Sequence, residues 1–572
     1  MLKRWVLRES DDDCVSRLSQ ALTVEPLIAR LLAHRGLTEP ESARRFLSSS
    51  LRADLPSPFL MTGMEPAAER LASAVTRGEL VCVWGDYDVD GTTGTAALIC
   101  FLREIGCNAI YYIPHRIDEG YGLNAEGIRQ LHGQGVRVVV SVDCGVSNYT
   151  EIELAQSLGI DVVVVDHHQP PELLPPALAI LNPHQTSCSF PDKGLCGAGL
   201  AFYLVIGLRA KLRDAGWFKA SEVPDIRRCL DVVTLGTIAD MVPLTGVNRV
   251  LSRRGLEVLG GSTRPGILAL KQVAGFPATG EITAGQVGFR LGPRINAAGR
   301  MDAALKVVEM LTTDSAEEAQ RIAEELDGHN RERQATEAKV LRQAIEQAGP
   351  EIGERYSLVL GQEGWHPGVL GIVASRIVER FYRPTVVVGF HDGVGKGSAR
   401  GIRGFHMVEG FRGCADLLEK FGGHEYAAGL TIRQKNFSSF AERFEEMAKQ
   451  SLAPEHLSPV IDVDAQLDFS EIGVELLRKI GALEPFGIGN PEPVFMTRGV
   501  EICERKGING GSRFKLRHAG RTFGAVAFGL EERWPETSSS KIDIVYRLNE
   551  NEWNGTYAVE LRLVDGHASV EA

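Results

Sequence analysis

The sequence lacks the features of a membrane or secreted protein. None of its apolar runs reaches the roughly 20 residues that a transmembrane helix needs. The N-terminal stretch, which begins Met-Leu-Lys-Arg-Trp-Val, has neither the apolar core nor the small-residue cleavage site of a signal peptide. We therefore expect a cytoplasmic protein with no membrane partner.

Paired cysteines and an excess of positive charge are also missing. The ten cysteines never form a Cys-x-x-Cys pair, and Cys82, Cys100 and Cys144 lie in or beside apolar segments. This pattern indicates reduced thiols and argues against a disulfide framework or a zinc site. The net charge of −12 excludes a global basic surface. A nucleic acid would have to bind in a local basic groove or through metal ions.

At 572 residues the chain is too long for one hydrophobic core, so several domains are expected. A long run rich in Ala, Glu, Arg and Gln is typical of an exposed helix that bridges two domains. The predicted regions are an N-terminal helical cap (1–75), a parallel-sheet α/β domain (76–312), the bridging helix (313–350), a second, smaller α/β domain (351–452) and a C-terminal β-barrel (453–572).

The tail of the chain alternates short apolar runs with turn residues. Five such strands favour a small barrel of the type that binds oligonucleotides, although a Greek-key sandwich stays open. The predicted strands are 460–463, 513–516, 522–528, 542–548 and 557–564.

The first α/β domain shows the clearest pattern. Apolar runs alternate with helical stretches of 10 to 13 residues, which predicts βαβ units and a parallel sheet. Right-handed crossovers then bring the carboxyl ends of all the strands to one edge of that sheet. The predicted strands are 80–84, 109–113, 136–142 and 161–165, and the predicted helices are 93–105, 124–133 and 147–158.

Polar side chains follow each of these four strands. A solvated acidic turn would explain the first of the four stretches by itself, but four such coincidences at one edge are poorly explained by chance. Three carboxylates within five residues also repel one another unless a cation lies between them. In strand order the residues are Asp86, Asp88 and Asp90; His115 and Arg116; Asp143; and Asp166, His167 and His168.

Further candidates lie outside the four strands. Asp240 ends another apolar segment, where a helix cap is the simpler interpretation. Arg294, Asn296 and Arg300 lie in a glycine-rich run that suits either phosphate contact or a structural turn. Later in the chain, small residues with one hydroxyl and one guanidinium predict an anion site, because such loops expose backbone N–H groups. That site comprises Gly397 to Gly401, with Ser398 and Arg400, and the Gly-Gly-His run that ends at His424.

The candidate ligands are carboxylates with one or two histidines, which favours Mn²⁺ or Mg²⁺ over zinc. They are more numerous than one ion requires, so two ions bridged by an aspartate are expected. Two ions roughly 3.5–4 Å apart are suited to hydrolysing a phosphodiester.

The order and spacing of these motifs resemble a known family. Asp86-Tyr-Asp-Val-Asp-Gly, isolated Asp143, Asp166-His-His and Gly236-Thr-Ile-Ala-Asp240 resemble the four motifs of DHH phosphoesterases. The runs Gly292–Arg300, His366–Arg376 and Gly422–His424 look like further motifs of one branch, the bacterial RecJ exonucleases. The resemblance covers nearly the whole chain.

The resemblance implies a 5′→3′ exonuclease that needs Mn²⁺ or Mg²⁺ and releases 5′-mononucleotides from single-stranded DNA during recombination and repair. It implies a monomer that works with single-strand-binding protein and a RecQ-type helicase. The implied metal ligands are Asp86, Asp88, Asp90, Asp143 as the bridge, His167 and Asp240, with His168 facing the scissile phosphate. The implied substrate contacts are Arg116, Ser398 and Arg400 on the 5′-phosphate, and Arg294, Asn296, Arg300 and His424.

One departure from the family pattern affects the anion site. Members often have Gly-Ser-Gly-Arg-Ser where this chain has Gly-Ser-Ala-Arg-Gly, so a hydroxyl is lost at Gly401 and backbone freedom at Ala399. Two other functions stay open. A DHH enzyme for short oligonucleotides or small phosphate compounds would usually lack the barrel and the bridging helix. A non-catalytic DNA-binding relative would have lost ligands, whereas every ligand position here is filled.

Overall fold

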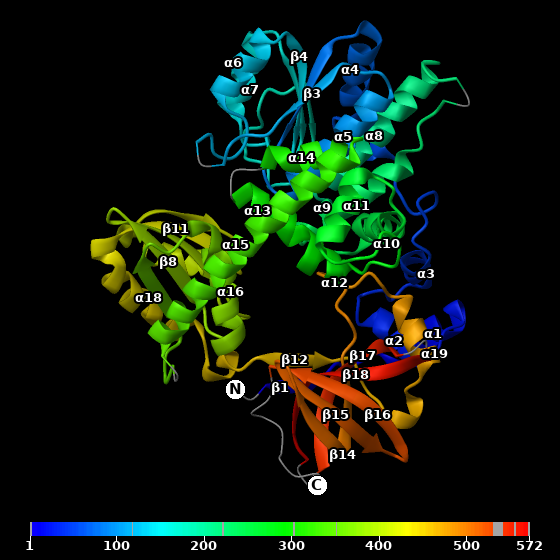
Figure 1. Ribbon diagram of the computed structural model, residues 1–572, viewed down its shortest axis with the longest axis vertical. Coiled ribbons are helices and arrows are strands. Elements are labelled where there is room, and N and C mark those ends of the chain that lie inside the picture. The colour runs from blue at the N-terminus through cyan, green and yellow to red at the C-terminus, as the bar shows by residue number, and fades with distance from the viewer. Residues whose placement is uncertain are drawn as a thin grey trace. The chain divides into compact units, whose positions relative to one another are not determined.

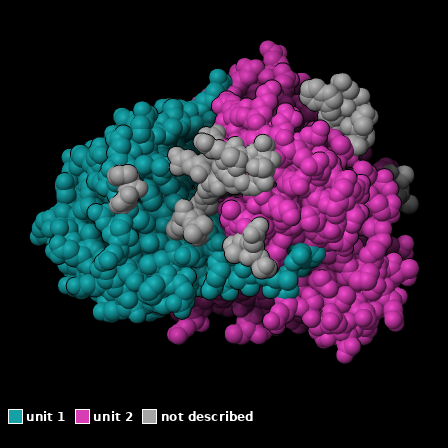
Figure 2. Space-filling view, turned by 90° about the horizontal axis from the view of Figure 1, so that it is seen from below, with its two compact units in different colours: residues 1–8, 331–466 teal, residues 9–330, 467–572 magenta. Residues whose placement is uncertain are grey.

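The computed structural model divides into two compact units, which are described separately below (Figures 1 and 2). The smaller unit contains residues 1–8 and 331–466, and the larger one contains residues 9–330 and 467–572. Among the helices that the structure describes, none has the length and apolarity to span a bilayer. The described residues are 3–116, 118–219, 222–300, 304–349, 352–529, 541–553 and 556–569.

The larger unit begins with helices, as the sequence predicts for the N-terminal cap. Pro26 and Pro40 each occupy the first position of a helix, where the missing N–H costs nothing. The helices are α1 (Asp12–Leu22), α2 (Pro26–Ala33), α3 (Pro40–Ser48) and α4 (Met64–Arg77), with a 3₁₀ turn at Pro58–Leu60. Residues 4–7 differ from the prediction, because they form strand β1 in the smaller unit.

The predicted parallel sheet is confirmed, and it has one strand more than expected. Its order is β3-β2-β4-β5-β6, and every neighbouring pair is parallel. The strands are β2 (Leu80–Gly85), β3 (Ala109–Tyr112), β4 (Val136–Val142), β5 (Asp161–Val165) and β6 (Ala179–Leu181). The connecting helices are α5 (Val89–Glu104), α6 (Ala125–Gly133) and α7 (Tyr149–Ser157).

Alternate residues of the strands face two different cores, which is why the strands read as continuous apolar runs. Val83, Val140 and Val163 lie side by side in register and belong to one core, with residues from α4, α5 and α8 (Gly197–Asp214). Trp84 and Val139 belong to the opposite core, with residues from α6 and α7. Both faces of the sheet are therefore covered, and its polar groups gather at the strand ends.

The rest of this α/β region is mostly helical. Its elements are a 3₁₀ turn at Ile226–Cys229, α8 (Gly197–Asp214), α9 (Leu230–Ala239), α10 (Gly246–Gly260), α11 (Pro265–Val273), α12 (Ala284–Gln286), a π-helical turn at Val287–Leu291, α13 (Gly292–Arg300) and α14 (Ala304–Thr312). The predicted bridging helix is α15 (Ala316–Ala348), which begins in the larger unit and ends in the smaller one.

The smaller unit contains a mixed sheet of order β10-β11-β9-β8-β7, in which only β7 and β8 are parallel. One face packs on α17 and α18, and the other packs on α16 and the end of α15. The strands are β7 (Leu358–Glu363), β8 (Thr385–His391), β9 (Val394–Arg400), β10 (Leu418–Gly423) and β11 (Ala427–Arg433). The helices are α16 (Pro367–Phe381), α17 (Met407–Arg412) and α18 (Phe437–Ser451), with 3₁₀ turns at Ala415–Leu417, Gln434–Asn436 and Pro454–Leu457.

One prediction for the smaller unit is wrong. Residues 397–400 were expected to form a loop of free N–H groups, but they lie inside β9, which pairs with β8 on one side and β11 on the other. Their backbone groups are used by the sheet, so only side chains could bind an anion there. Ser398 and Arg400 lie two residues apart and so share one face of the strand.

The chain ends in a five-stranded barrel, which confirms the predicted architecture. Strands β14 and β17 close it, and β16 and β18 form its one parallel pair. Its strands are β14 (Phe495–Ile508), β15 (Gly511–His518), β16 (Arg521–Phe528), β17 (Lys541–Trp553) and β18 (Thr556–Ala568), preceded by a 3₁₀ turn at Phe469–Glu471 and α19 (Val474–Gly481). The prediction that residues 460–463 belong to the barrel is wrong. They form β12 (Val460–Val463), which pairs with β1 (Arg4–Leu7) in the smaller unit, where β13 (Ala465–Gln466) follows.

Candidate active site

The first acidic motif forms the turn between β2 and α5. The helix begins at Val89, earlier than predicted, because the carboxylate of Asp88 caps it by accepting a hydrogen bond from the N–H of Gly91 at 3.0 Å. Asp86 is buried at the end of β2, and Asp90 is fully buried in the first helical turn. A Cβ on Gly91 would come within 2.5 Å of the Asp86 carbonyl oxygen, so this turn requires glycine.

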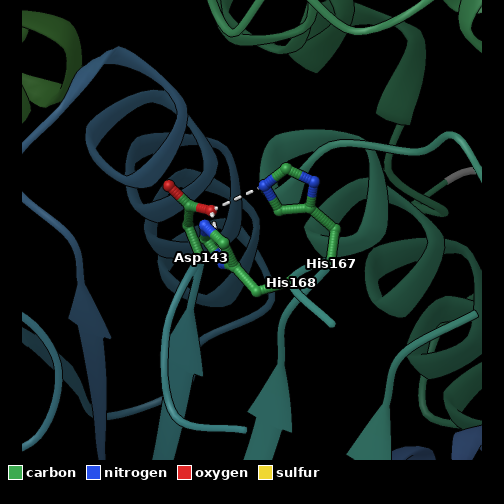
Figure 3. A group of neighbouring side chains, drawn as sticks. All are labelled: Asp143, His167 and His168. Carbon is green, nitrogen blue, oxygen red and sulfur yellow. Dashed lines mark ion pairs between the residues drawn. The ribbon is translucent and has the colours of Figure 1, made fainter. Parts of the chain in front are cut away.

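Asp143 follows β4 in a left-handed conformation, with φ of 64°. This conformation is uncommon for residues other than glycine, although aspartate adopts it more readily than most. Its backbone is held on both sides: its N–H donates to the Val165 carbonyl at 2.8 Å, and its carbonyl accepts from the Tyr121 hydroxyl at 2.9 Å. Its carboxylate lies 3.1 Å from Nε2 of His167 (Figure 3).

The Asp166-His167-His168 triplet follows β5. Asp166 is buried, and one of its oxygens accepts hydrogen bonds from both the backbone N–H and Nδ1 of His168, at 3.1 and 2.7 Å. Its other oxygen accepts from the N–H of Val146 at 2.9 Å. The side-chain amide of Asn182, just after β6, donates to the His168 carbonyl at 2.8 Å. Asp166 and Asn182 therefore fix His168, a role that the sequence did not assign to either.

Asp240 is the residue at which α9 ends, so the simple helix-cap interpretation also describes its backbone. Its carboxylate nevertheless joins the cluster. Oδ2 of Asp240 lies 3.7 Å from Nε2 of His167, and Oδ2 of Asp90 lies 3.8 Å from the same nitrogen. Asp90 is held from behind, since its two oxygens accept hydrogen bonds from the N–H groups of Gly197 and Ala198 at 2.5 and 2.8 Å.

Three overlapping groups of ligand atoms result, each with all its atoms within 4.8 Å of one another. The structure thus brings together every acidic and histidine residue that the sequence assigned to the metal site. Asp143 and His167 each belong to two groups. The groups are Asp86, Asp88 and Asp143; Asp90, His167 and Asp240; and Asp143, His167 and His168.

The donor atoms fit a divalent cation. Among the described side chains, one buried carboxylate oxygen each of Asp86, Asp143 and Asp240 lacks a hydrogen-bond partner. Buried charges are costly unless they are paired or coordinate a metal, so these oxygens are explained by an ion between them. Carboxylates with one imidazole are the ligands expected for manganese or magnesium.

The pKa shifts of the clustered carboxylates also indicate a cation site. Burial and the charge of Asp88 raise the pKa of Asp86 to about 7, and burial with the charges of Asp90 and Asp88 raises the pKa of Asp240 to about 9. Burial and the neighbouring carboxylates also raise the pKa of Asp143 well above its ordinary value. Asp166 differs: burial alone would raise its pKa, but the hydrogen bonds from His168 and Val146 outweigh burial and lower it. The carboxylates of Asp86, Asp143 and Asp240 thus lack the compensating charge that a cation would supply.

The predicted substrate contacts of the larger unit differ in their surroundings. Arg116 is exposed, and its guanidinium carbon lies 4.9 Å from the ring centre of Tyr87. Tyr87 belongs to the turn of Asp86 and Asp88 between β2 and α5, which is called the metal loop below. Arg294 already forms an ion pair with Asp327 at 2.9 Å, which favours the structural interpretation of this residue. Asn296 is half-buried in α13, and the side chain of Arg300 lies outside the described part of the structure.

The end of α13 nevertheless reaches the metal loop. A Cβ on Gly299 would come within 2.3 Å of the Tyr87 carbonyl oxygen and 3.9 Å of the Asp88 Cα. Glycine at this position therefore lets the helix lie directly against the turn that carries Asp88. This contact explains the glycine in the run that the sequence singled out, and no substrate is needed to explain it.

In the smaller unit, Ser398 and Arg400 lie beside α16. A Cβ on Gly371 of that helix would come within 3.1 Å of the Arg400 guanidinium and 3.8 Å of the Ser398 Cβ. Burial lowers the pKa of Arg400, and Nη1 donates to the Ala399 carbonyl at 2.8 Å. No described carboxylate forms an ion pair with Arg400. His424 is exposed in the turn between β10 and β11, where its N–H donates to Ala427 at 2.7 Å.

Comparison with known proteins defines the class. The model of the DHH family, N-terminal domain, matches residues 80–237, and that of the DHHA1 domain matches residues 354–450. Fold and site together are those of a DHH-family enzyme. The model of the RecJ OB domain also matches, at residues 463–565.

Full-length relatives then give the particular family. The chain is 36% identical to the single-stranded-DNA-specific exonuclease RecJ of Bacillus subtilis, covering 99% of this chain and 71% of the relative. It is 37% identical to that of Escherichia coli, covering 94% and 95%. The crystal structure of RecJ in complex with Mn²⁺ from Thermus thermophilus is similar with a TM-score of 0.84, at 32% identity over 100% of this chain and 80% of that one. The Mg²⁺ complex gives 0.79, at 31% identity over 100% and 79%. The chain belongs to the RecJ family of single-stranded-DNA-specific exonucleases.

Proposed function

We propose that this protein removes 5′-mononucleotides one at a time from the 5′ end of single-stranded DNA, using two divalent cations. The observation that carries the proposal is the cluster at the edge of the parallel sheet, in which Asp143 and His167 are each shared by two groups of ligands. Three groups linked through shared members suit two ions better than one.

The ligands divide between the two ions. We assign Asp86, Asp88 and Asp143 to one ion, and Asp90, His167 and Asp240 to the other, with Asp143 as the bridge. When bound, two such ions activate a water molecule and stabilise the leaving oxygen of a phosphodiester. Manganese and magnesium are both candidates, because RecJ of Thermus thermophilus has been crystallised with each.

His168 contacts the scissile phosphate in this proposal. Its Nδ1–H donates to Asp166, so the free nitrogen, Nε2, is the one that can donate to a phosphate oxygen. The hydrogen bond with Asp166 raises the pKa of His168. This shift favours the protonated ring, the form whose Nε2–H can donate to a phosphate oxygen.

Direction requires a site that recognises one end of the strand. Ser398 and Arg400 supply a hydroxyl and a half-buried guanidinium on one face of β9, which suits charge-assisted binding of a terminal phosphate. Arg116 belongs to the other unit, and its share in this contact stays a prediction, as do the substrate contacts of Arg294, Asn296, Arg300 and His424.

The alternative functions find less support. A DHH enzyme for small phosphate compounds does not need the barrel, whereas this chain aligns with full-length relatives and has a RecJ-type barrel. A non-catalytic relative would not keep the complete ligand set. On family grounds we further propose a cytoplasmic monomer that acts in recombination and repair with single-strand-binding protein and a RecQ-type helicase.

The decisive assay is release of labelled mononucleotide from a 5′-³²P-labelled single strand of about 30 nucleotides, with MnCl₂ or MgCl₂ and with EDTA as the control. Metal-dependent release of mononucleotide as the first labelled product supports the proposal. Release of label first from a 3′-labelled strand would contradict the direction. Faster turnover of a dinucleotide than of the 30-mer would favour the small-substrate function.

A further inference from the structure

The amino-terminal turn of α8 lies against the metal cluster, although none of its side chains is among the expected ligands. Asp90 is 107 residues away in the chain, yet its two carboxylate oxygens accept hydrogen bonds from the N–H groups of Gly197 and Ala198. Cys196 caps the same helix, since its sulfur accepts from the Gly199 N–H at 3.4 Å. Asp90 is thus the carboxylate that this helix end stabilises.

The approach is close enough to exclude side chains. A Cβ on Gly197 would lie 2.7 Å from the Cβ of Asp143, 2.9 Å from Oδ2 of Asp90 and 3.1 Å from the Asp143 Cα. A Cβ on Gly236 of α9 would lie 3.0 Å from Oδ1 of Asp90 and 2.4 Å from the Thr93 hydroxyl. Glycine at these two positions lets α8 and α9 reach Asp90, and Gly197 also separates Asp90 from Asp143 by a fixed spacing.

The buried carboxylates of the cluster differ in their hydrogen-bond partners. Asp90 is fully buried and has two backbone donors, whereas Asp143 and Asp240 each have an oxygen without a hydrogen-bond partner. The unpartnered oxygen of Asp143 belongs to the residue against which Gly197 packs. Both oxygens of Asp90 are therefore held before an ion binds, whereas Asp143 and Asp240 each keep an oxygen that an ion could bind.

We propose that the first turn of α8 is a positioning element of the metal centre: the N–H groups of Gly197 and Ala198 hold the carboxylate of Asp90 in one orientation before metal binds, and Gly197 sets its spacing from Asp143. The inference rests on the metal role proposed above for Asp90 and Asp143. It makes Gly197 a positioning residue that acts through ligands and touches neither ion nor DNA.

Two consequences follow from this assignment. Replacing Gly197 should weaken metal binding, because an added methyl group displaces the backbone of Asp143 and the carboxylate of Asp90 together. Asp90→Asn should destabilise the metal-free protein, because an amide group would turn a donor toward the N–H groups of α8. Asp240→Asn should cost less stability, because Oδ2 of Asp240 has no hydrogen-bond partner to lose.

The first test measures Mn²⁺ affinity by titration calorimetry on the full-length protein and on two glycine variants. Gly199→Ala is the matched control, because it lies in the same turn and its Cβ would meet only side-chain atoms, Leu195 Cδ2 at 3.0 Å and Cys196 Sγ at 3.7 Å. We expect Gly197→Ala to bind Mn²⁺ about tenfold or more weakly than Gly199→Ala, the range typical of residues that orient metal ligands. Equal affinities for the two variants would overturn the inference.

The second test compares Asp90→Asn with Asp240→Asn in EDTA, using the melting temperature, and it decides the matter if Gly197→Ala does not fold. We expect Asp90→Asn to melt clearly below the wild type and Asp240→Asn to change the melting temperature much less. A fall for Asp90→Asn no larger than that for Asp240→Asn would overturn the inference. A wild-type protein that binds no Mn²⁺ would instead refute the proposed metal centre, so the two failures are distinguishable.

Discussion

Asp166 and His168 are joined by two hydrogen bonds to a single carboxylate oxygen, one from the backbone N–H at 3.1 Å and one from Nδ1 at 2.7 Å. The second oxygen of Asp166 is held by the Val146 N–H, so the carboxylate cannot rotate freely. The ring of His168 is therefore fixed in one orientation, although 47% of its side chain is exposed.

Asp166→Asn should leave the metal site in place and misplace the phosphate contact. We expect kcat to fall roughly tenfold to a hundredfold, the usual cost of losing a carboxylate that orients an imidazole, while Mn²⁺ affinity changes only a few fold. Steady-state kinetics on single-stranded DNA and Mn²⁺ calorimetry measure the two effects. Asp225→Asn, which removes a carboxylate paired with Arg227 at the surface, is the control that should change neither. An equal loss of metal affinity would make Asp166 a member of the metal site.

Removal of metal should lower thermal stability. Without an ion, the cluster keeps several buried carboxylate oxygens unpaired. Binding to the folded state alone stabilises a protein by about 2.7 kcal/mol when the ligand is present at a hundred times its Kd. We expect the melting temperature in excess Mn²⁺ to be a few degrees higher than in EDTA. NaCl added at the same ionic strength is the control and should have no such effect. A melting temperature indifferent to Mn²⁺ would contradict the metal site.

Much of the site could be predicted because parallel strands impose a simple rule. The Val-rich runs identify β2, β4 and β5, and their common direction brings Asp86, Asp143 and His167 to one edge. The sequence does not predict β6, because a strand of three residues, Ala-Ile-Leu, is too short to show a hydrophobic period. Without β6, the sequence also gives no reason to place Asn182, which follows this strand, beside the loop of His168.

Contacts between distant segments could not be predicted from local pattern. The hydrogen bond between Asp90 and the N–H of Gly197 in α8 joins residues 107 positions apart, and the sequence around Gly197 does not indicate this contact. The glycines near residues 397–400 are typical of a turn, so the local sequence predicts a loop there, whereas the pairing partners that make it a strand lie in β8 and β11. The sequence pattern does not predict β14, the first strand of the barrel, because charged residues and Gly499 interrupt its apolar alternation.

Asp143→Ala should abolish cleavage. In the proposed assignment this residue is shared by both ions, so its loss leaves each group of ligands incomplete. Binding of a fluorescent single strand in EDTA should survive, because no DNA contact has been removed, and fluorescence anisotropy measures it. Near-normal turnover with manganese supplied would remove Asp143 from the mechanism.

Arg249 offers a test of the fold. It is buried in α10, where its guanidinium donates to the carbonyls of Phe46 at 2.9 Å, Leu483 at 2.7 Å and Ala482 at 3.2 Å. Arg249→Met removes three hydrogen bonds, each worth about 0.5–1.5 kcal/mol. Each carbonyl keeps a second donor, namely the Ser49 hydroxyl, the Asn490 side-chain amide and the Arg253 guanidinium respectively. We expect a clear fall in melting temperature, measured by calorimetry, whereas Arg77→Met at an exposed position should change it by no more than about a degree.

The same contacts limit what deletions can show. Removing residues 455–572 would take away two of the carbonyls that hold Arg249, and it would also remove β12, the partner of β1. A loss of DNA binding in that deletion would therefore mix lost contacts with lost folding. Point substitutions give cleaner information on the barrel and on the smaller unit.

The polarity of the enzyme is tested by Arg400. Two metal ions would hydrolyse whichever phosphodiester reaches them, so preference for one end must come from a group that binds that end. Arg400 suits this role because it is half-buried, forms no ion pair with a described carboxylate, and shares its face of β9 with the Ser398 hydroxyl. A charge-assisted contact is worth about 1.5–3 kcal/mol, or roughly ten- to a hundredfold in affinity.

Arg400→Ala should therefore lose most of the preference for 5′-phosphorylated over 5′-hydroxyl DNA, measured as the ratio of kcat/KM on two otherwise identical strands. Lys396→Ala is the matched control, since Lys396 lies on the same strand and the same face but is more exposed. It should weaken both substrates equally and leave the ratio unchanged. Arg400→Lys keeps the charge but not the paired N–H geometry, so it should recover only part of the preference. If Arg400→Ala keeps the wild-type ratio, the end of the strand is recognised elsewhere and the direction of digestion needs another source.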